Sequence, residues 1–120
     1  MKKADRQDIG VVIVNWNTRD LLMKCMESFL REGVPEKNIV IVDQRSTDGS
    51  SALVKRKHPR SKLLRGENRG YGQALNAGTR FLQTEFIIFS NADIVVQPGA
   101  LRKLETIMRE GPEIGLAGCR

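Results

Sequence analysis

Short apolar runs alternate with amphipathic segments along the chain, and this alternation constrains the fold more than any other feature. The runs Ile9 to Val14, Ile39 to Val42 and Phe86 to Phe89 are typical of strands buried on both faces, and Lys62 to Leu64 indicates a weaker strand. Ile114 to Ala117 is interpreted as the beginning of one more strand. Strands that alternate with helices predict an α/β domain with a mainly parallel, Rossmann-like sheet and helices on both faces.

The helices are predicted from the four amphipathic segments between and after these runs. The first follows a cap at Asn17 or Thr18, the second covers about Ser51 to Lys57 after a cap at Asp48 or Ser46, the third runs from about Gly72 to Leu82, and the fourth has Pro98 at its first position. Apolar side chains at helical spacing predict a buried stripe on three of them. The predicted buried residues are Leu21, Leu22, Cys25, Met26, Phe29 and Leu30 in the first helix, Ala74, Leu75, Gly78, Phe81 and Leu82 in the third, and Leu101, Leu104, Ile107 and Met108 in the fourth.

The composition is that of one ordinary folded domain, and it excludes several classes of protein. The 120 residues suffice for a single domain over the whole chain, residues 1–120. No apolar run approaches the roughly 20 residues of a membrane-spanning helix, and the polar start, Met1 to Asp8, does not resemble a signal peptide. We therefore expect a cytoplasmic protein, and the cytoplasmic face of a membrane is included in that expectation. Cys25 and Cys119 lack metal-ligand spacing and are expected to be reduced, and His58 is given no role.

Polar side chains follow three of the predicted strands. Asn15 and Asn17 come after the first strand, Asp43 ends the second, and Asn91 and Asp93 follow the last long apolar run. Ligands of open α/β sheets bind beyond the carboxyl ends of the strands, and parallel strands bring these ends to one edge. We therefore expect the five residues to lie at one site, although a turn or a helix cap explains any one of them equally well.

Four motifs, taken in order, resemble those of the family 2 glycosyltransferases. They are VVIVNWN, IVIVDQRSTDGS, NRGYGQALNAG and FIIFSNADIVVQPGAL, and the resemblance extends from Ile9 to about Gly118. These are inverting enzymes of the GT-A fold that use nucleotide-diphospho-sugars. The resemblance implies a UDP- or dTDP-sugar donor and an acceptor that is a glycan or a lipid-linked sugar.

The same resemblance implies a nucleotide site at the ends of the first two strands. Asp43 resembles the carboxylate that accepts a hydrogen bond from the imide N–H of a uracil or thymine base. Val14, Asn15, Trp16 and Asn17 resemble the segment that lines the base pocket. Trp16 is predicted either to pack on the base or ribose, or to lie in the core.

The glycine-rich motif is implied to complete the nucleotide site. Asn68 and Arg69 are expected near the base or the diphosphate, and Gly70 and Gly72 are expected to let backbone approach the ligand closely. Gly78 is expected to let the third helix pack tightly against the sheet.

The sequence NAD lies at the position of the family's DXD motif. By resemblance, Asp93 is the ligand of a Mn²⁺ or Mg²⁺ ion that bridges the two donor phosphates, and hard oxygen ligands suit such ions. Asn91 departs from the strict motif, and its amide is expected to bind the ribose or a metal-bound water.

The resemblance also indicates what the chain lacks. Inverting transfer needs a general base, which in this family is an Asp or Glu in the second half of the domain, so the catalytic residue is unknown. We expect the chain to be the nucleotide-binding half of a larger enzyme or a shortened form, inactive by itself. The apolar stretch Ile114 to Cys119 is expected to promote self-association through an unpaired sheet edge.

Three other functions are weighed against this interpretation. A non-catalytic nucleotide or nucleotide-sugar binding module would use the same residues without chemistry. The net charge of +6 suits a nucleic-acid-binding domain, but the basic residues are scattered and aromatic residues make up only 5% of the chain, so no nucleic-acid partner is expected. A phospho-acceptor signalling domain would need an acidic pair where this chain has Asn15 and Asn17.

Overall fold

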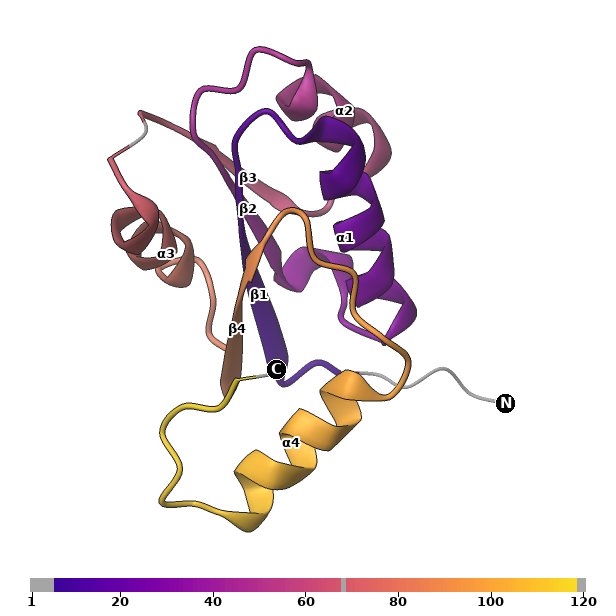
Figure 1. Cartoon of the computed structure of the whole chain (residues 1–120), viewed down its shortest axis with the longest axis vertical. Coiled ribbons are helices and arrows are strands. Elements are labelled where there is room, and N and C mark those ends of the chain that lie inside the picture. The colour runs from indigo at the N-terminus through magenta and orange to yellow at the C-terminus, as the bar shows by residue number, and fades with distance from the viewer. Residues whose placement is uncertain (1–5, 68, 119–120) are drawn as a thin grey trace.

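The computed structural model describes residues 6–67 and 69–118, which form one sheet with helices on both of its faces (Figure 1). Strands and helices alternate as the sequence predicts. In chain order the elements are β1 (Ile9–Asn15), α1 (Arg19–Arg31), the short 3₁₀ helix η1 (Glu36–Asn38), β2 (Ile39–Asp43), α2 (Ser50–Lys57), β3 (Lys62–Arg65), α3 (Tyr71–Thr79), β4 (Phe86–Asn91) and α4 (Ala100–Glu110).

The sheet has the strand order β3-β2-β1-β4, and its three strand pairs are all parallel. The chain moves outward from β1 to β3 and then crosses over to place β4 on the other side of β1. The strand order therefore reverses between β1 and β4, and open α/β sheets bind ligands at such a switch point. The predicted fold class is confirmed.

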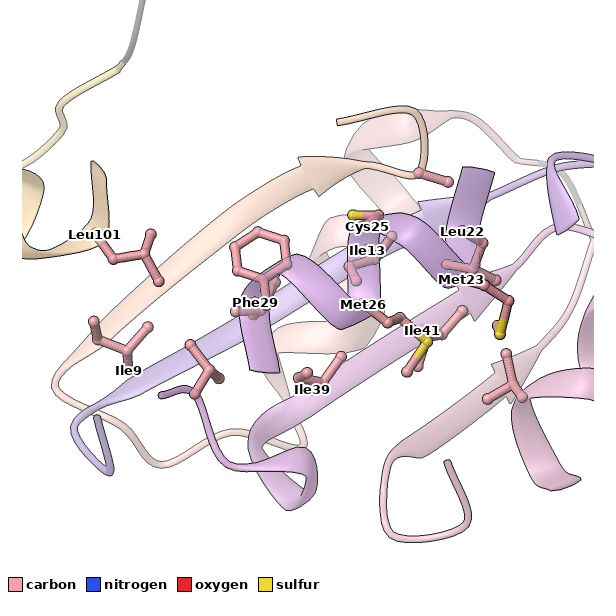
Figure 2. Packing of buried hydrophobic residues seen from close by; sticks show 14 residues of the cluster. Ile9, Ile13, Leu22, Met23, Cys25, Met26, Phe29, Ile39, Ile41 and Leu101 are labelled. Atoms are coloured by element: carbon pink, nitrogen blue, oxygen red, sulfur yellow. The ribbon is translucent and has the colours of Figure 1, made fainter. Parts of the chain in front are cut away.

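One face of the sheet carries the larger part of the core (Figure 2). Helix α1 lies against this face and buries Leu22, Met26 and Phe29 on the alternate residues of β1 and β2, including Ile13 and Ile41. A strand points successive side chains to opposite faces, so every second residue of an apolar run meets α1. Helices α2 and α4 add Val54 and Leu101 to the same layer.

Helix α3 covers the other face, where it lies over β1 and β2 (Figure 1). Val12, Val40 and Val42 form this second layer with Ala74 of the helix. Close approach depends on Gly78, because a Cβ at this position would lie 2.4 Å from a methyl carbon of Val12. The expectation that Gly78 lets the helix pack against the sheet is confirmed.

The prediction that Phe86 to Phe89 is buried on both faces is wrong. Phe86 and Ile88 pack on the core, but Ile87 and Phe89 are 36% and 44% exposed. The reason is the topology: β4 is an edge strand, and α3 covers β1 and β2 rather than β4. A run of apolar residues does not reveal which strand will lie at the edge.

Three predictions about the third and fourth helices are also wrong. Helix α3 ends at Thr79, so Phe81 lies beyond it and is 50% exposed rather than buried. Helix α4 begins at Ala100, and Pro98 therefore precedes its N-cap, Gly99, instead of opening the helix. Because α4 contacts the core mainly through its first turn, Ile107 is 48% exposed and Met108 is only half-buried.

The last part of the described chain forms no strand. Residues 114–118 have irregular backbone, so the strand predicted from Ile114 to Ala117 is absent from the described residues. The predicted self-association depended on this strand, so the described residues do not support it. Cys119 lies outside the described residues. None of the described helices is both long and apolar enough to cross a membrane.

Candidate functional site

Asn15 and Asp43 end β1 and β2 side by side and are both completely buried. They are direct partners in the register of the parallel pair, and the Asn15 Nδ2 amide donates a hydrogen bond of 2.8 Å to Asp43 Oδ1. A buried carboxylate is stable only when its oxygens are hydrogen-bonded. The two strand ends therefore form one polar unit beneath the surface of the switch-point edge.

The second oxygen of Asp43 is also occupied. Asp43 Oδ2 accepts hydrogen bonds from the Ser46 backbone N–H at 3.0 Å and from the Ser51 hydroxyl at 3.2 Å. The Arg65 guanidinium lies over it, with Nε 3.7 Å from Oδ2. The carboxylate has no exposed surface, so its role as acceptor for a base imide stays a prediction that requires local movement.

Ser46 joins the loop after β1 to the loop after β2. Its hydroxyl oxygen accepts hydrogen bonds from the Asn15 amide at 3.2 Å and from the Asn17 backbone N–H at 2.8 Å. Asn17 Oδ1 in turn accepts a bond of 2.7 Å from the Thr47 N–H. Ser46 is therefore no helix cap, and it links two loops that are about thirty residues apart in the sequence.

The position of Trp16 decides between the two roles predicted for it, in the core or against the base or ribose. Its side chain is 59% exposed on the loop after β1, so it does not belong to the core. The neighbouring Asn17 has a φ of 51°, in the left-handed region that Asn tolerates better than most residues. Val14, the fourth residue of the predicted base-pocket segment, is partly buried and packs on the α3 layer.

Asp48 holds the beginnings of two helices. Its Oδ2 accepts a bond of 2.9 Å from the N–H of Arg19, the first residue of α1, and its Oδ1 accepts one of 3.0 Å from the N–H of Ser50, the first residue of α2. Desolvation opposes ionisation of this carboxyl, but the bonds from the Ser50 hydroxyl and from the two backbone N–H groups outweigh it and lower the pKa of Asp48. Thr18 occupies the N-cap position of α1, yet its hydroxyl donates to Asn15 Oδ1 at 2.6 Å instead of capping the helix.

A hollow of about 360 Å³ lies between the ends of β2 and β3 and the first turns of α3. Its inner wall is apolar and its rim is polar, which is the usual make-up of a small-molecule site. The lining residues are Val42, Gln44, Leu64, Arg65, Gly66, Glu67, Arg69, Gly70, Gln73, Ala74 and Ala77. Two residues predicted for the site, Arg69 and Gly70, line it, and a third, Asn68, lies outside the described residues.

The end of β4 presents the other predicted residues on the far side of β1. Asn91 and Asp93 are exposed, and between them Ala92 is buried in the core. The Asp93 carboxylate makes no hydrogen bond or ion pair with the described part of the chain. Below it, Cys25 is fully buried against Ser90, and burial raises the pKa of the Cys25 thiol to about 11, which makes it a core residue rather than a nucleophile.

The predicted residues thus fall into two groups at one edge of the sheet. Asn15, Asn17 and Asp43 are in contact with one another or share partners. The β4 group lies on the strand next to β1, and the hollow beside β2 and β3 lies on the other side of β1, with β4 and β3 three strand spacings apart, roughly 14 Å. An elongated ligand is needed to reach both the hollow and the β4 group.

Sequence reasoning missed three residues that build this edge. Arg65, Gln44 and Ser51 contact the strand ends or line the hollow. Arg65 is the last residue of β3, the strand with the weakest sequence pattern. It could have been predicted, because polar residues also end the other strands of the sheet. Ser51 carried no signal, because a serine in the first turn of a helix is ordinary.

Comparison with known proteins identifies the family. The model of the family described as glycosyl transferase family 2 matches residues 10–120. The chain belongs to the family 2 glycosyltransferases. It is 30% identical over 112 residues to an uncharacterized glycosyltransferase of Nostoc and 32% identical over 99 residues to the succinoglycan biosynthesis protein ExoO of Rhizobium meliloti.

The matched relatives are much longer than this chain. The alignments cover 90% and 81% of the chain but only 35% and 28% of these two relatives. Among solved structures, S. aureus TarS 1–349 superposes with a TM-score of 0.73 at 20% identity, over 88% of this chain and 33% of that one. The mannosyltransferase PcManGT from Pyrobaculum calidifontis, in complex with GDP-Man and Mn²⁺, superposes with a TM-score of 0.66 at 25% identity, over 83% of this chain and 31% of that one.

Proposed function

We propose that this family 2 glycosyltransferase region binds a UDP- or dTDP-sugar across the carboxyl edge of the sheet, for inverting transfer to a glycan or lipid-linked acceptor. The observation that carries the proposal is the division of this edge into a partly apolar hollow beside β2 and β3 and a free carboxylate at the end of β4. A nucleoside diphosphate is elongated and has one aromatic end and one anionic end, which matches this division.

The base end is assigned to the hollow. Val42, Leu64 and Ala74 supply an apolar wall for a nucleobase, while Arg69 and Gly70 lie at its rim. The exposed Trp16 indole supplies a surface for the base or ribose, as aromatic side chains do in many nucleotide sites. TarS has also been solved with UDP and with UDP-GlcNAc, which supports a uridine donor as one candidate class.

The buried pair of Asn15 and Asp43 organises this end of the site. It fixes the two loops through Ser46, so that the backbone N–H and C=O groups around Asn17 keep their positions without a ligand. Preorganised groups of this kind cost little ordering entropy when a nucleotide binds. A direct bond from Asp43 to the base remains part of the proposal only if the carboxylate gains exposure on binding.

The diphosphate end is assigned to Asn91 and Asp93. Within the described residues no group of three His, Cys, Asp or Glu side chains is arranged to hold a metal by itself. A single free carboxylate nevertheless fits Mg²⁺ or Mn²⁺, because such ions are commonly held by one or two carboxylates together with substrate phosphates and water. The residues therefore fit a metal that binds with the nucleotide, and PcManGT has been solved with both GDP-Man and Mn²⁺.

The chain's own residues would then perform the binding steps of the reaction. Asp93 would hold a divalent cation at the diphosphate end, Asn91 would donate to a ribose or phosphate oxygen, and the hollow would exclude water from the base. A bound divalent cation would supply charge screening for the leaving diphosphate. The general base for the acceptor hydroxyl is not assigned to any described residue.

Titration of UDP and dTDP into the 120-residue chain, with and without Mn²⁺, tests the proposal. We expect heat and backbone amide shifts at residues 15–17, 43–47, 69–73 and 91–93, with tighter binding when Mn²⁺ is present. Shifts confined to the amino ends of the strands, or none at millimolar nucleotide, would refute it. Release of UDP from a sugar donor, measured in parallel, separates an active enzyme from a module that only binds.

A further inference from the structure

Arg65 occupies a distinctive position at the end of β3. Its Nη2 donates a hydrogen bond of 2.9 Å to the Ser46 carbonyl oxygen, and its Nε lies 3.7 Å from the buried Asp43 Oδ2. These two anchors come from the loop and the strand end that form the base side of the candidate site. They hold a flexible side chain in one orientation at the edge of the sheet.

Most of the Arg65 guanidinium is nevertheless available to a ligand. The side chain is 57% exposed and lines the hollow at this edge. A guanidinium has five N–H donors, and only the one to Ser46 is used in a hydrogen bond with the described residues. Arg65 therefore presents unused donors at the place where Asp43, the acceptor predicted by resemblance, has no exposed surface.

The chemistry of the two groups differs in what it selects. A buried carboxylate would accept from an N–H of the base, whereas an exposed guanidinium donates to a carbonyl oxygen. Uracil and thymine carry a carbonyl at ring position 4, where cytosine carries an amino group that cannot accept. A site built around a donor discriminates strongly against a ligand that lacks the matching acceptor.

We propose that Arg65 is the specificity-determining residue of the base site, anchored on Asp43 and Ser46 and donating to the position-4 carbonyl of a uracil or thymine base. This inference rests on the proposed nucleotide function. Asp43 then acts through Arg65 as a positioning residue, because its charge and its place in the network hold the guanidinium toward the hollow.

The other arginines at this rim are placed differently. Arg45 and Arg69 are 70% and 69% exposed, and both lie beside Glu67, at 3.8 Å and 3.5 Å. Neither side chain forms a hydrogen bond or an ion pair with Asp43 or Ser46 in the described part of the chain. Their positive charges are partly balanced by a surface carboxylate, and they are not held over the inner wall by a buried one.

The test compares UDP with CDP, whose bases differ at ring position 4 (carbonyl against amino group) and at position 3 (N–H against an acceptor nitrogen), so the preference is assigned to Arg65 only by its loss in the Arg65 variants. Calorimetry with Mn²⁺ present is done on the wild-type chain, on Arg65→Met and Arg65→Lys, and on Arg56→Met, an exposed arginine of α2 that controls for the loss of charge. We expect the wild-type chain and Arg56→Met to prefer UDP over CDP by about tenfold or more. Arg65→Met should weaken UDP about tenfold with little change for CDP, so that the preference disappears.

The Arg65→Lys variant shows whether a loss of binding is caused by a loss of folding. Lysine keeps the positive charge beside Asp43 but not the planar fork that bonds to two partners at once. We expect its thermal midpoint to stay near that of the wild type while most of the UDP preference is lost. A structural role for Arg65 would lower the thermal midpoint and affect the two nucleotides equally.

Two kinds of result would overturn the inference. If the wild-type chain binds UDP and both Arg65 variants keep its preference over CDP, or bind UDP more tightly, then Arg65 only covers Asp43 and the inference alone fails. If the wild-type chain binds neither nucleotide at millimolar concentration, the proposed function fails and the inference fails with it.

Discussion

Replacing Gly78 by alanine should loosen the contact between α3 and the sheet. The added Cβ would lie 2.4, 3.0 and 3.3 Å from the Cγ1, Cγ2 and Cβ atoms of Val12. Carbon atoms in contact are normally about 3.5–4.0 Å apart, and Val12 is completely buried, so it has no free space to turn into. The helix must therefore move away from β1.

The size of the effect follows from two opposing terms. Overpacking a core costs about 1–3 kcal/mol, whereas alanine in place of a helical glycine gains about 0.5–1 kcal/mol. Because all three carbons of a branched side chain are too close, we take the upper part of the first range and expect a net loss of about 1–2 kcal/mol. Gly72→Ala in the same helix is the matched control, since nothing lies within 4 Å of its Cβ, and it should stabilise by up to about 1 kcal/mol.

Urea unfolding of five chains, wild type, Gly78→Ala, Gly72→Ala, Val12→Ala and Gly78→Ala with Val12→Ala, measures these free energies. The double variant should recover stability relative to the sum of its single variants by about 1 kcal/mol or more, because removing two methyl groups opens the space that the new Cβ needs. A Gly78→Ala chain as stable as Gly72→Ala, or effects that add within about 0.5 kcal/mol, would refute the packing argument. Ala74 and Ala77 of α3 line the hollow. Because Gly78→Ala moves this helix, it should also weaken nucleotide binding.

Three further predictions concern ionisable groups. Asp93→Asn should abolish most of the Mn²⁺ dependence of UDP binding in calorimetry while weak binding without metal persists; equal metal dependence in both chains would contradict the assignment. The lowered pKa of Asp48 means that its contribution to stability is present above the ordinary aspartate pKa of 3.8 and is lost as the pH falls through the lower folded value. Unfolding of Asp48→Asn followed from pH 7 downward should therefore show a shallower acid loss than wild type, and parallel curves would count against it. In a Cys119→Ser background, Cys25 should react with a thiol reagent only at the rate of unfolding at pH 8, because burial raises its pKa to about 11; rapid reaction of the folded chain would show that the thiol is accessible.

The sequence predicted the fold because its apolar runs have lengths and spacings that few other architectures accept. It also predicted which edge of the sheet carries the polar residues, since Asn15 and Asp43 come directly after the apolar runs that form β1 and β2. Which strand lies at the edge depends on the order of the strands, and no local pattern in Phe86 to Phe89 contains that information.

The details of the site were harder to predict for a related reason. Burial of Asp43 depends on Ser46, Ser51 and Arg65, three residues that reach it from a loop, a helix and a neighbouring strand. Each has an ordinary alternative role in the sequence as a cap, a turn residue or a solvated charge. Only the packed structure shows that they meet at one carboxylate.

The links made by Ser46 and Asp48 have a consequence for how this chain can vary. Ser46 forms hydrogen bonds with Asn15 and Asn17, and Asp48 accepts hydrogen bonds from the first residue of α1 and from the first residue of α2. A change in either loop therefore breaks contacts in the other, and a compensating change must occur some thirty positions away. Among homologues we expect the residues at positions 15, 17, 46 and 48 to be inherited as a set, so that the two loops are exchanged together or not at all.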